Sequence, residues 1–275
     1  MIRERQGSAC DNGAMNKDDN PASTESPLLH EENGELSLHF NFPTIQSRML
    51  KTDPERLVLD YTRTMMGFLL LHPRPERIAM IGLGGGSLAK YCHRRLPDSD
   101  FTAVELSAEV IALRQSFGIP DDDERFRILC ADGADFVRRA IDAFDVLLID
   151  GFDREGQPAQ LCSVDFYDNC HAALRSGGIL AVNLCTDDSA YERYVARIRD
   201  SFDGRIVIAE ADEGENKIVF AGKSDQVRAA FPPSFNELAA RLRQLEGAHP
   251  VELDKTAQKI LRREQAPCSK RGRRR

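Results

Sequence analysis

The chain has 275 residues, 41% of them hydrophobic and 29% charged, a composition typical of one large globular domain with small appendages. No apolar run comes near the roughly 18 residues that a membrane-spanning helix needs, so we exclude a transmembrane protein. The net charge of −7 disfavours nucleic acid as the main partner and agrees better with a cationic one.

The first part of the chain is predicted to hold little structure. Residues 1–33 are rich in polar residues and poor in branched apolar ones, which predicts a disordered tail. This tail lacks the apolar segment of a signal peptide, so we expect a cytoplasmic protein. Alternating stretches at 36–40 and 56–59 predict a small β-hairpin region. The apolar stretch Tyr61–Leu71 is predicted to be a helix and is a candidate for part of a homodimer interface.

Strands and helices alternate from residue 77 onwards. Near-continuous apolar runs predict five strands, at 78–81, 101–104, 127–130, 144–149 and 178–184, each followed by a helix-compatible segment. Two later strands, at 205–209 and 217–221, are predicted to pair antiparallel. This pattern is typical of an α/β fold with a doubly wound, mostly parallel sheet of seven strands that ends in an antiparallel edge hairpin.

The domain organisation follows from these elements. We predict a tail (1–33), a β-hairpin region (34–60), a nucleotide-binding α/β domain (61–225), two C-terminal helices (226–264) and a basic tail (265–275). Five of the last six residues are Lys or Arg, so the rest of the chain carries a charge of −12. The seven cysteines include no CxxC pair and the histidines have no ligand-like spacing, so we predict neither a disulfide framework nor a metal site.

A glycine-rich loop follows the first predicted strand of the α/β domain. Ligands of such sheets bind at the carboxyl ends of the strands, so the residues there are the candidate site. The run 82–87 reads GLGGGS, and Gly82, Gly84 and Gly86 would let the backbone approach a nucleotide closely. Its spacing departs from the dinucleotide pattern G-x-G-x-x-G, and a tight structural turn is the alternative.

Acidic residues follow the next three strands. Glu105 lies 23 residues past the start of the glycine loop, where a carboxylate can accept both ribose hydroxyls. Asp132 and Gly133 could read an adenine edge, although Asp132 could instead only cap the following helix. Asp150 and Asp153 could hold and deprotonate an amine. Three acids at three successive strand ends predict a co-substrate that contains adenosine.

Several short motifs follow one another in the order and spacing of a known family. They are Ile45-Gln46, His72–Pro75, Ile81–Gly86, Val104-Glu105, Ala131–Gly133, Ala143–Val146, Ile149–Asp153, Gly156-x-Pro158, Phe166-Tyr167 and Leu174–Leu180. With these motifs the chain resembles the spermidine/spermine synthase (polyamine aminopropyltransferase) family, which has the class I methyltransferase fold. The resemblance covers about half of the chain.

The resemblance implies a transferase. Decarboxylated S-adenosylmethionine would be the co-substrate, and the acceptor would be a small polyamine such as putrescine. Asp150 would take the proton of the attacking amine, Asp153 would anchor the cationic acceptor, and the chain would form a homodimer. The resemblance and the strand-end pattern together assign the co-substrate site to Gln46, Gly82, Gly84, Gly86, Glu105, Asp132, Gly133 and Asp150.

The chain also departs from the family pattern. The family's glycine loop carries an aspartate that pairs with the amine of the decarboxylated co-substrate, and the corresponding place near Gly86 has no acid. Arg154 follows Asp153 where the family has proline, and one extra residue precedes Pro158. The family's acid in the preceding helix is missing around 61–64, and 183–185 replace a segment that carries glutamine.

These departures leave two alternatives to an aminopropyltransferase. A methyltransferase that uses ordinary S-adenosylmethionine would agree with the missing acid of the glycine loop, because that acid would repel the carboxylate of the ordinary form. A non-catalytic relative that binds a nucleoside is the other alternative. Against it stand Glu105, Asp132, Asp150 and Asp153, since a decayed site would be expected to lose some of them.

Overall fold

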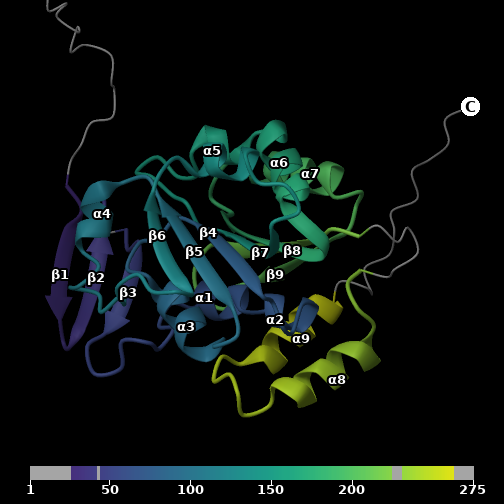
Figure 1. Cartoon of the computed structure of the whole chain (residues 1–275), viewed down its shortest axis with the longest axis horizontal. Coiled ribbons are helices and arrows are strands. Elements are labelled where there is room, and N and C mark those ends of the chain that lie inside the picture. The colour runs from purple at the N-terminus through teal and green to yellow at the C-terminus, as the bar shows by residue number, and fades with distance from the viewer. Residues whose placement is uncertain (1–25, 42–43, 225–230, 263–275) are drawn as a thin grey trace, which may run out of the picture.

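The computed structural model of the chain describes residues 26–41, 44–224 and 231–262, and its centre is a seven-stranded sheet (Figure 1). The strands are β4 (Arg77–Ile81), β5 (Asp100–Glu105), β6 (Phe126–Cys130), β7 (Phe144–Ile149), β8 (Leu174–Cys185), β9 (Ile206–Glu210) and β10 (Asn216–Gly222). Their order is β6-β5-β4-β7-β8-β10-β9. Strands β4 to β8 are parallel, and β10 pairs antiparallel with both β8 and β9. The predicted fold class is confirmed.

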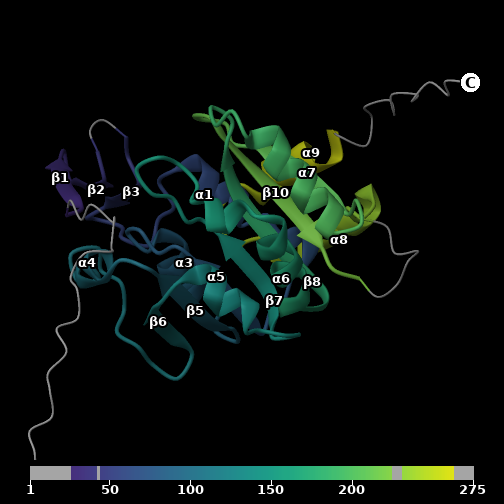
Figure 2. The ribbon, with the colours of Figure 1, turned by 90° about the horizontal axis from the view of Figure 1, so that it is seen from above.

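Helices cover both faces of this sheet (Figures 1 and 2). One layer contains α1 (Asp60–Met65), α2 (Phe68–Leu71), α3 (Ser87–Arg95), α8 (Phe235–Leu245) and α9 (Leu253–Arg262), and the other contains α5 (Gly133–Arg138), α6 (Val164–Ala173) and α7 (Tyr191–Ser201). A short helix α4 (Ala108–Ala112) follows β5, and a 3-10 turn, Ala159–Cys162, precedes α6. Alternate residues of the central strands face opposite layers. In β4, Ile78 and Met80 pack against the layer that contains α1, and Ala79 and Ile81 pack against the layer that contains α5. Both faces are therefore apolar, as the near-continuous apolar runs predict.

A small antiparallel sheet precedes the α/β domain and differs from the prediction. It consists of β1 (Leu28–Glu32), β2 (Glu35–His39) and β3 (Ser47–Leu50). Strand β1 lies inside the segment predicted as a tail, because the Asn33-Gly34 turn, with positive φ at both residues, folds β1 back onto β2. Residues 1–25 and the basic tail 265–275 lie outside the described residues.

The predicted strand at 56–59 is not formed. The guanidinium of Arg63 donates to the backbone carbonyls of Leu57 and Val58, at 2.9 and 2.7 Å. These carbonyls therefore bond to a side chain instead of to a neighbouring strand. The segment runs as an irregular connection into α1.

The predicted helix at 61–71 is two short helices, α1 and α2, which are separated at Gly67. A Cβ atom at Gly67 would lie 2.6 Å from Cγ2 of Thr256 in α9, so the C-terminal helix packs directly against the break. The apolar side chains from Met65 to Leu71 are buried in this chain's own core. These apolar side chains are therefore not available for the homodimer interface that was suggested for this stretch. None of the helices in the described ranges is long and apolar enough to cross a membrane.

Candidate active site

The glycine loop lies at the carboxyl end of β4 and is packed against the end of β7. Gly82 has φ +92°, and a Cβ atom there would lie 2.3 Å from the carbonyl oxygen of Asp150. The backbone N–H of Asp150 in turn donates to the carbonyl of Ile81 at 2.9 Å. Glycine is thus required at position 82 both for its backbone conformation and for the close approach of the two chain segments. The chain order reverses at β4, so this contact lies at the switch point of the sheet.

The N-terminal sheet covers the glycine loop from the other side. A Cβ atom at Gly85 would lie 2.6 Å from Oγ of Ser47 and 2.8 Å from the ring of Phe117. At Gly86, which has φ +66°, it would lie 2.5 Å from Cδ1 of Ile119. Neither position has room for an acidic side chain. The absence of the family's acid from this loop therefore has a steric explanation. The same packing brings the segment that contains Gln46, the residue before Ser47, to the glycine loop.

Glu105 ends β5 beside this loop. Its Oε2 atom accepts a hydrogen bond from the backbone N–H of Leu83 at 2.9 Å, and Oε1 accepts one from that of Ser107 at 2.9 Å. An ionised carboxylate can accept about four hydrogen bonds, so capacity for two ligand hydroxyls remains. The next side chain, Leu106, is 64% exposed and offers an apolar surface that the sequence reasoning missed.

Asp132 and Gly133 follow β6 and have structural roles. Asp132 is the N-cap of α5, and its Oδ1 atom accepts a hydrogen bond from the backbone N–H of Asp135 at 2.9 Å. The capping role considered for it is therefore confirmed. A Cβ atom at Gly133 would lie 2.3 Å from Cγ2 of Ile81, so this glycine is needed where α5 begins against β4.

Asp150 is half-buried at the end of β7 and receives two hydrogen bonds from distant parts of the chain. The hydroxyl of Tyr61 in α1 donates to Oδ2 at 3.2 Å, and Nδ2 of Asn183 in β8 donates to Oδ1 at 2.9 Å. Burial raises the pKa of Asp150 above that of an ordinary aspartate, and the hydrogen bonds from Asn183 and Tyr61 offset part of this rise. Burial, and then the neighbouring charge of Asp150, raise the pKa of Tyr61.

Asp153 is exposed and lies on a tight turn of the loop after β7. Its Oδ1 atom accepts a hydrogen bond from the backbone N–H of Glu155, and its own N–H donates to the carbonyl of Gly156, both at 2.8 Å. Further along the loop, Nε2 of Gln157 donates to the carbonyl of Asn183 at 3.3 Å. The loop after β7 is thereby tied to β8, and the two predicted catalytic acids lie in different environments.

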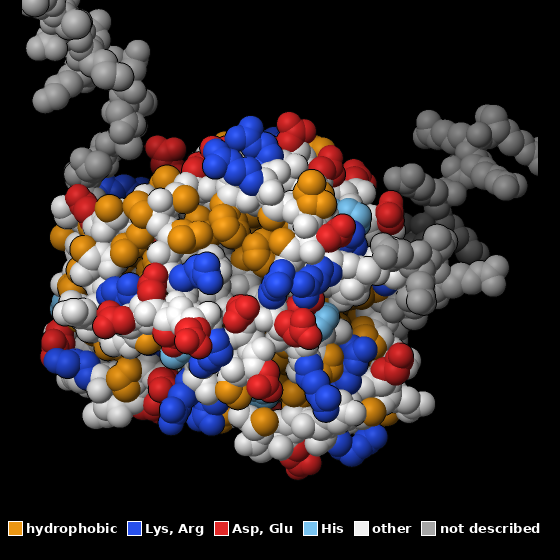
Figure 3. All heavy atoms as spheres, viewed as in Figure 1, with side chains coloured by type: hydrophobic (Ala, Val, Ile, Leu, Met, Phe, Trp, Pro, Cys, Tyr) orange, Lys and Arg blue, Asp and Glu red, His pale blue; other side chains and the backbone are white. Residues whose placement is uncertain are grey.

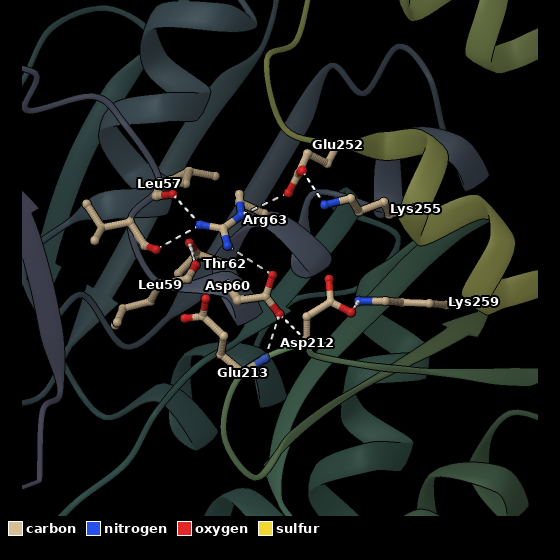
Figure 4. Close-up of polar contacts among 11 residues, drawn as sticks. Leu57, Leu59, Asp60, Thr62, Arg63, Asp212, Glu213, Glu252, Lys255 and Lys259 are labelled. Carbon is tan, nitrogen blue, oxygen red and sulfur yellow. Dashed lines mark hydrogen bonds and ion pairs between the residues drawn. The ribbon is translucent and has the colours of Figure 1, made fainter.

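Helix α1, which carries Tyr61, is anchored by a polar cluster (Figure 4). The buried carboxylate of Asp60 pairs with Arg63 at 3.1 Å and accepts hydrogen bonds from the backbone N–H groups of Asp212 and Glu213 in the β9–β10 connection. Asp212 in turn pairs with Lys259 of α9 at 2.9 Å. These contacts fix the first turn of α1, and with it the position of the Tyr61 hydroxyl.

Tyr61 and Asn183 were noticed in the sequence only as departures from the family pattern. Asn183 had a usable signal, because it is a polar residue inside the apolar run of β8, and a buried amide requires partners. Tyr61 had no such signal in the sequence. It lies 89 positions before Asp150 in the chain and reaches it only through the packing of α1.

One face of the molecule carries charges of both signs. Figure 3 shows Lys and Arg side chains mixed with Asp and Glu side chains over one face of the molecule, with apolar side chains between them. Across residues 26–41, 44–224 and 231–262, no three His, Cys, Asp or Glu side chains gather as they would around a metal ion.

Comparison with known proteins finds relatives that match most of the chain. The spermine/spermidine synthase domain family matches residues 59–200. The polyamine aminopropyltransferase of Chromobacterium violaceum is 36% identical over 231 residues, which cover 78% of this chain and 88% of that protein. The one of Neisseria meningitidis serogroup A is 39% identical over 198 residues, 71% of this chain and 75% of that protein. A spermidine synthase solved in complex with the transition-state analogue AdoDATO shares the fold, with a TM-score of 0.63 at 20% identity, over 86% of this chain and 85% of that one.

Proposed function

Because the chain belongs to the spermine/spermidine synthase family, we propose that it is a polyamine aminopropyltransferase. It transfers an aminopropyl group from decarboxylated S-adenosylmethionine to a primary amine such as putrescine. The observation that carries the proposal is the half-buried Asp150, which receives two hydrogen bonds and lies directly against the glycine loop. A carboxylate held in this way at the nucleotide end of the sheet can accept a proton from an amine.

The co-substrate binds across the ends of β4, β5 and β6. The ribose hydroxyls donate to the remaining lone pairs of Glu105, and the adenine ring packs on the exposed Leu106 with its edge toward Asp132 and Gly133. Gly82, Gly84 and Gly86 keep the loop free of side chains where the nucleoside passes. Gln46, in the segment that covers this loop, closes the site from the N-terminal sheet.

The reaction needs positioning and one proton acceptor. Alkylamines have a pKa of about 10, so the acceptor arrives protonated and must lose a proton before it attacks. Asp150 takes that proton. The nitrogen lone pair then forms a bond to the methylene carbon next to the sulfonium, and the carbon–sulfur bond breaks with its electron pair left on sulfur. The products are a longer polyamine and neutral methylthioadenosine. We assign Asp153, on the exposed turn, to the second ammonium of the acceptor.

The pH dependence of turnover should report on Asp150. Because this carboxylate must be ionised to accept a proton, kcat/KM should fall as the pH falls through its raised pKa, above the value of about 4 of an ordinary aspartate. Tyr61→Phe removes one donor to the ionised form, so the acid limb should move to higher pH by about one unit. A pH–rate profile measures both. An acid limb of Tyr61→Phe that coincides with that of the wild type would remove Tyr61 from the mechanism.

Glu105→Gln should weaken co-substrate binding about tenfold or more, as measured by titration calorimetry with decarboxylated S-adenosylmethionine. A glutamine has one acceptor oxygen, so it cannot serve both backbone N–H groups and both ribose hydroxyls, and hydrogen bonds to charged groups are worth about 1.5–3 kcal/mol. Glu109→Gln, on the exposed first turn of α4, is the matched control and should bind like the wild type. Equal affinity of both variants would contradict the assignment of Glu105.

The proposed function is tested with purified protein, decarboxylated S-adenosylmethionine and a panel of putrescine, cadaverine and spermidine. We expect methylthioadenosine to be released with at least one of the three amines and not when the amine is omitted. Failure to release it with any of them, from protein that binds the co-substrate, would overturn the proposal. The acceptor with the highest kcat/KM then identifies the substrate.

We propose that the protein is a cytoplasmic homodimer and that strand β1 contributes to the interface. All five residues of β1 are exposed, and Leu28 and Leu29 are 49% and 42% exposed on a strand at the edge of its sheet. An exposed apolar edge strand is a surface that another chain can cover. Light scattering at micromolar concentration measures the assembly state, and a monomeric mass would contradict this part of the proposal.

A further inference from the structure

The side chain of Asn216 lies one step behind the acid of the candidate site. Its Nδ2 atom donates to Oδ1 of Asn183 at 2.9 Å, and Nδ2 of Asn183 donates to Oδ1 of Asp150 at 2.9 Å. Asn216 pairs with Cys185 across the antiparallel β8–β10 ladder, and Asn183 pairs with Ile218. The two asparagines are therefore diagonal neighbours on one face of the sheet, within reach of each other.

The orientation of the Asn183 amide decides what Asp150 meets. An asparagine side chain has one donor end and one acceptor end. With the NH2 group toward Asp150, it stabilises the ionised carboxylate. With the carbonyl toward Asp150, it repels the carboxylate and can pair only with the protonated acid. Asn183 is 2% exposed, so solvent does not compensate for the wrong orientation.

Asn216 selects between these orientations. Because it presents its NH2 group to Oδ1 of Asn183, the carbonyl end of Asn183 is occupied and the NH2 end is directed at Asp150. The backbone of Asn183 is held independently by Gln157, whose Nε2 donates to its carbonyl at 3.3 Å. The remaining freedom of Asn183 is rotation of its side chain, which is held by Asp150 at the NH2 end and by Asn216 at the carbonyl end.

Few other charged or titratable groups face Asp150 and could change the pH at which it ionises. From α1, the titratable side chain that faces it is Tyr61, a donor as well. From β8 the facing group is the neutral Asn183, and the adjoining glycine loop carries no charge. The acids of the neighbouring segments are engaged elsewhere: Asp153 with the N–H of Glu155, and Asp60 with Arg63 and the 212–213 backbone.

We infer that Asn216 is a positioning residue that keeps Asp150 in its proton-accepting form by fixing the amide of Asn183. The inference rests on the proposed function, in which Asp150 is the base. Asn216 belongs to the antiparallel β9–β10 hairpin, whereas Gly82, Glu105 and Asp150 lie at the carboxyl ends of parallel strands. The network couples the state of Asp150 to β10, and a change at Asn216 should appear as a shift in the pH at which Asp150 ionises.

The test is a titration of Asp150 by NMR in protein labelled with ¹³C at the aspartate side-chain carboxyl carbon, with the Asp150→Asn spectrum assigning the signal. Asn216→Leu has nearly the same shape and no donor, so the Asp150 midpoint should rise by about one pH unit. Asn216→Asp presents only acceptors and turns the Asn183 carbonyl toward Asp150, so the midpoint should rise further. Asn169→Asp on α6 adds the same charge outside the network and should leave the midpoint unchanged.

The outcomes separate cleanly. If only the added charge mattered, Asn216→Asp would shift the midpoint and folded Asn216→Leu would not, and that result overturns the inference. Should Asn216→Leu fail to fold, an unshifted midpoint in Asn216→Asp overturns it alone. The titration needs no turnover, so it gives its answer even if the aminopropyltransferase assay fails. If turnover is present, the acid limb of kcat/KM should move by the same amount as the NMR midpoint.

Discussion

Asp150→Asn should lower kcat by about 10²–10⁴-fold while the affinity for decarboxylated S-adenosylmethionine stays within a few-fold of the wild type. The amide cannot accept the proton of an alkylammonium, so the nitrogen lone pair is not released for attack. The variant keeps the size of the side chain and leaves the backbone contact between residue 150 and Gly82 unchanged. Steady-state kinetics measure the first quantity and titration calorimetry the second.

The control for this variant is Asp168→Asn, on the exposed face of α6. It makes the same chemical change outside the site, so kcat should equal that of the wild type. A loss of co-substrate binding in Asp150→Asn equal to its loss of turnover would mean that Asp150 serves binding and not proton transfer. Unchanged turnover would remove it from the reaction altogether.

Gly82→Ala should abolish co-substrate binding and destabilise the fold by about 2 kcal/mol or more. The added methyl group would lie 2.3 Å from the carbonyl oxygen of Asp150, and φ of +92° is itself strained for alanine. Relieving the clash requires β4 and β7 to separate at their carboxyl ends, where the nucleoside site is. Denaturant unfolding and calorimetry measure the two effects.

Gly177→Ala is the control for Gly82→Ala, because it introduces backbone strain without a steric clash. Gly177 has φ +79°, but a Cβ atom there would have nothing within 4 Å, and it lies near the amino end of β8. Its substitution should lower stability by about 1 kcal/mol and leave binding intact. If Gly82→Ala behaved in the same way, the contact between the glycine loop and Asp150 would not be essential for the site.

The parallel sheet could be predicted because each of its central strands is buried on both faces and therefore appears as an uninterrupted apolar run. Once the strands were placed, the rule that ligands bind at their carboxyl ends located Gly82, Glu105 and Asp150. Those three residues do lie at neighbouring strand ends, within a network of backbone contacts. This part of the site depends on local sequence and on fold class alone.

The donors to Asp150 could not be predicted in the same way. Tyr61 reaches it from a helix that packs across the sheet, and Asn183 is oriented by Asn216, which belongs to an antiparallel strand. These contacts depend on packing angles and on strand register that no local pattern contains. The break at Gly67 has the same origin, because it is set by Thr256 of a helix almost two hundred residues later.

The most direct test of the central claim gives the wild-type protein ordinary and decarboxylated S-adenosylmethionine together with the preferred amine and identifies the products by mass spectrometry. The aminopropyltransferase proposal predicts methylthioadenosine and an amine extended by one aminopropyl group. A methylated amine with S-adenosylhomocysteine would contradict it and would establish a methyltransferase on the same fold.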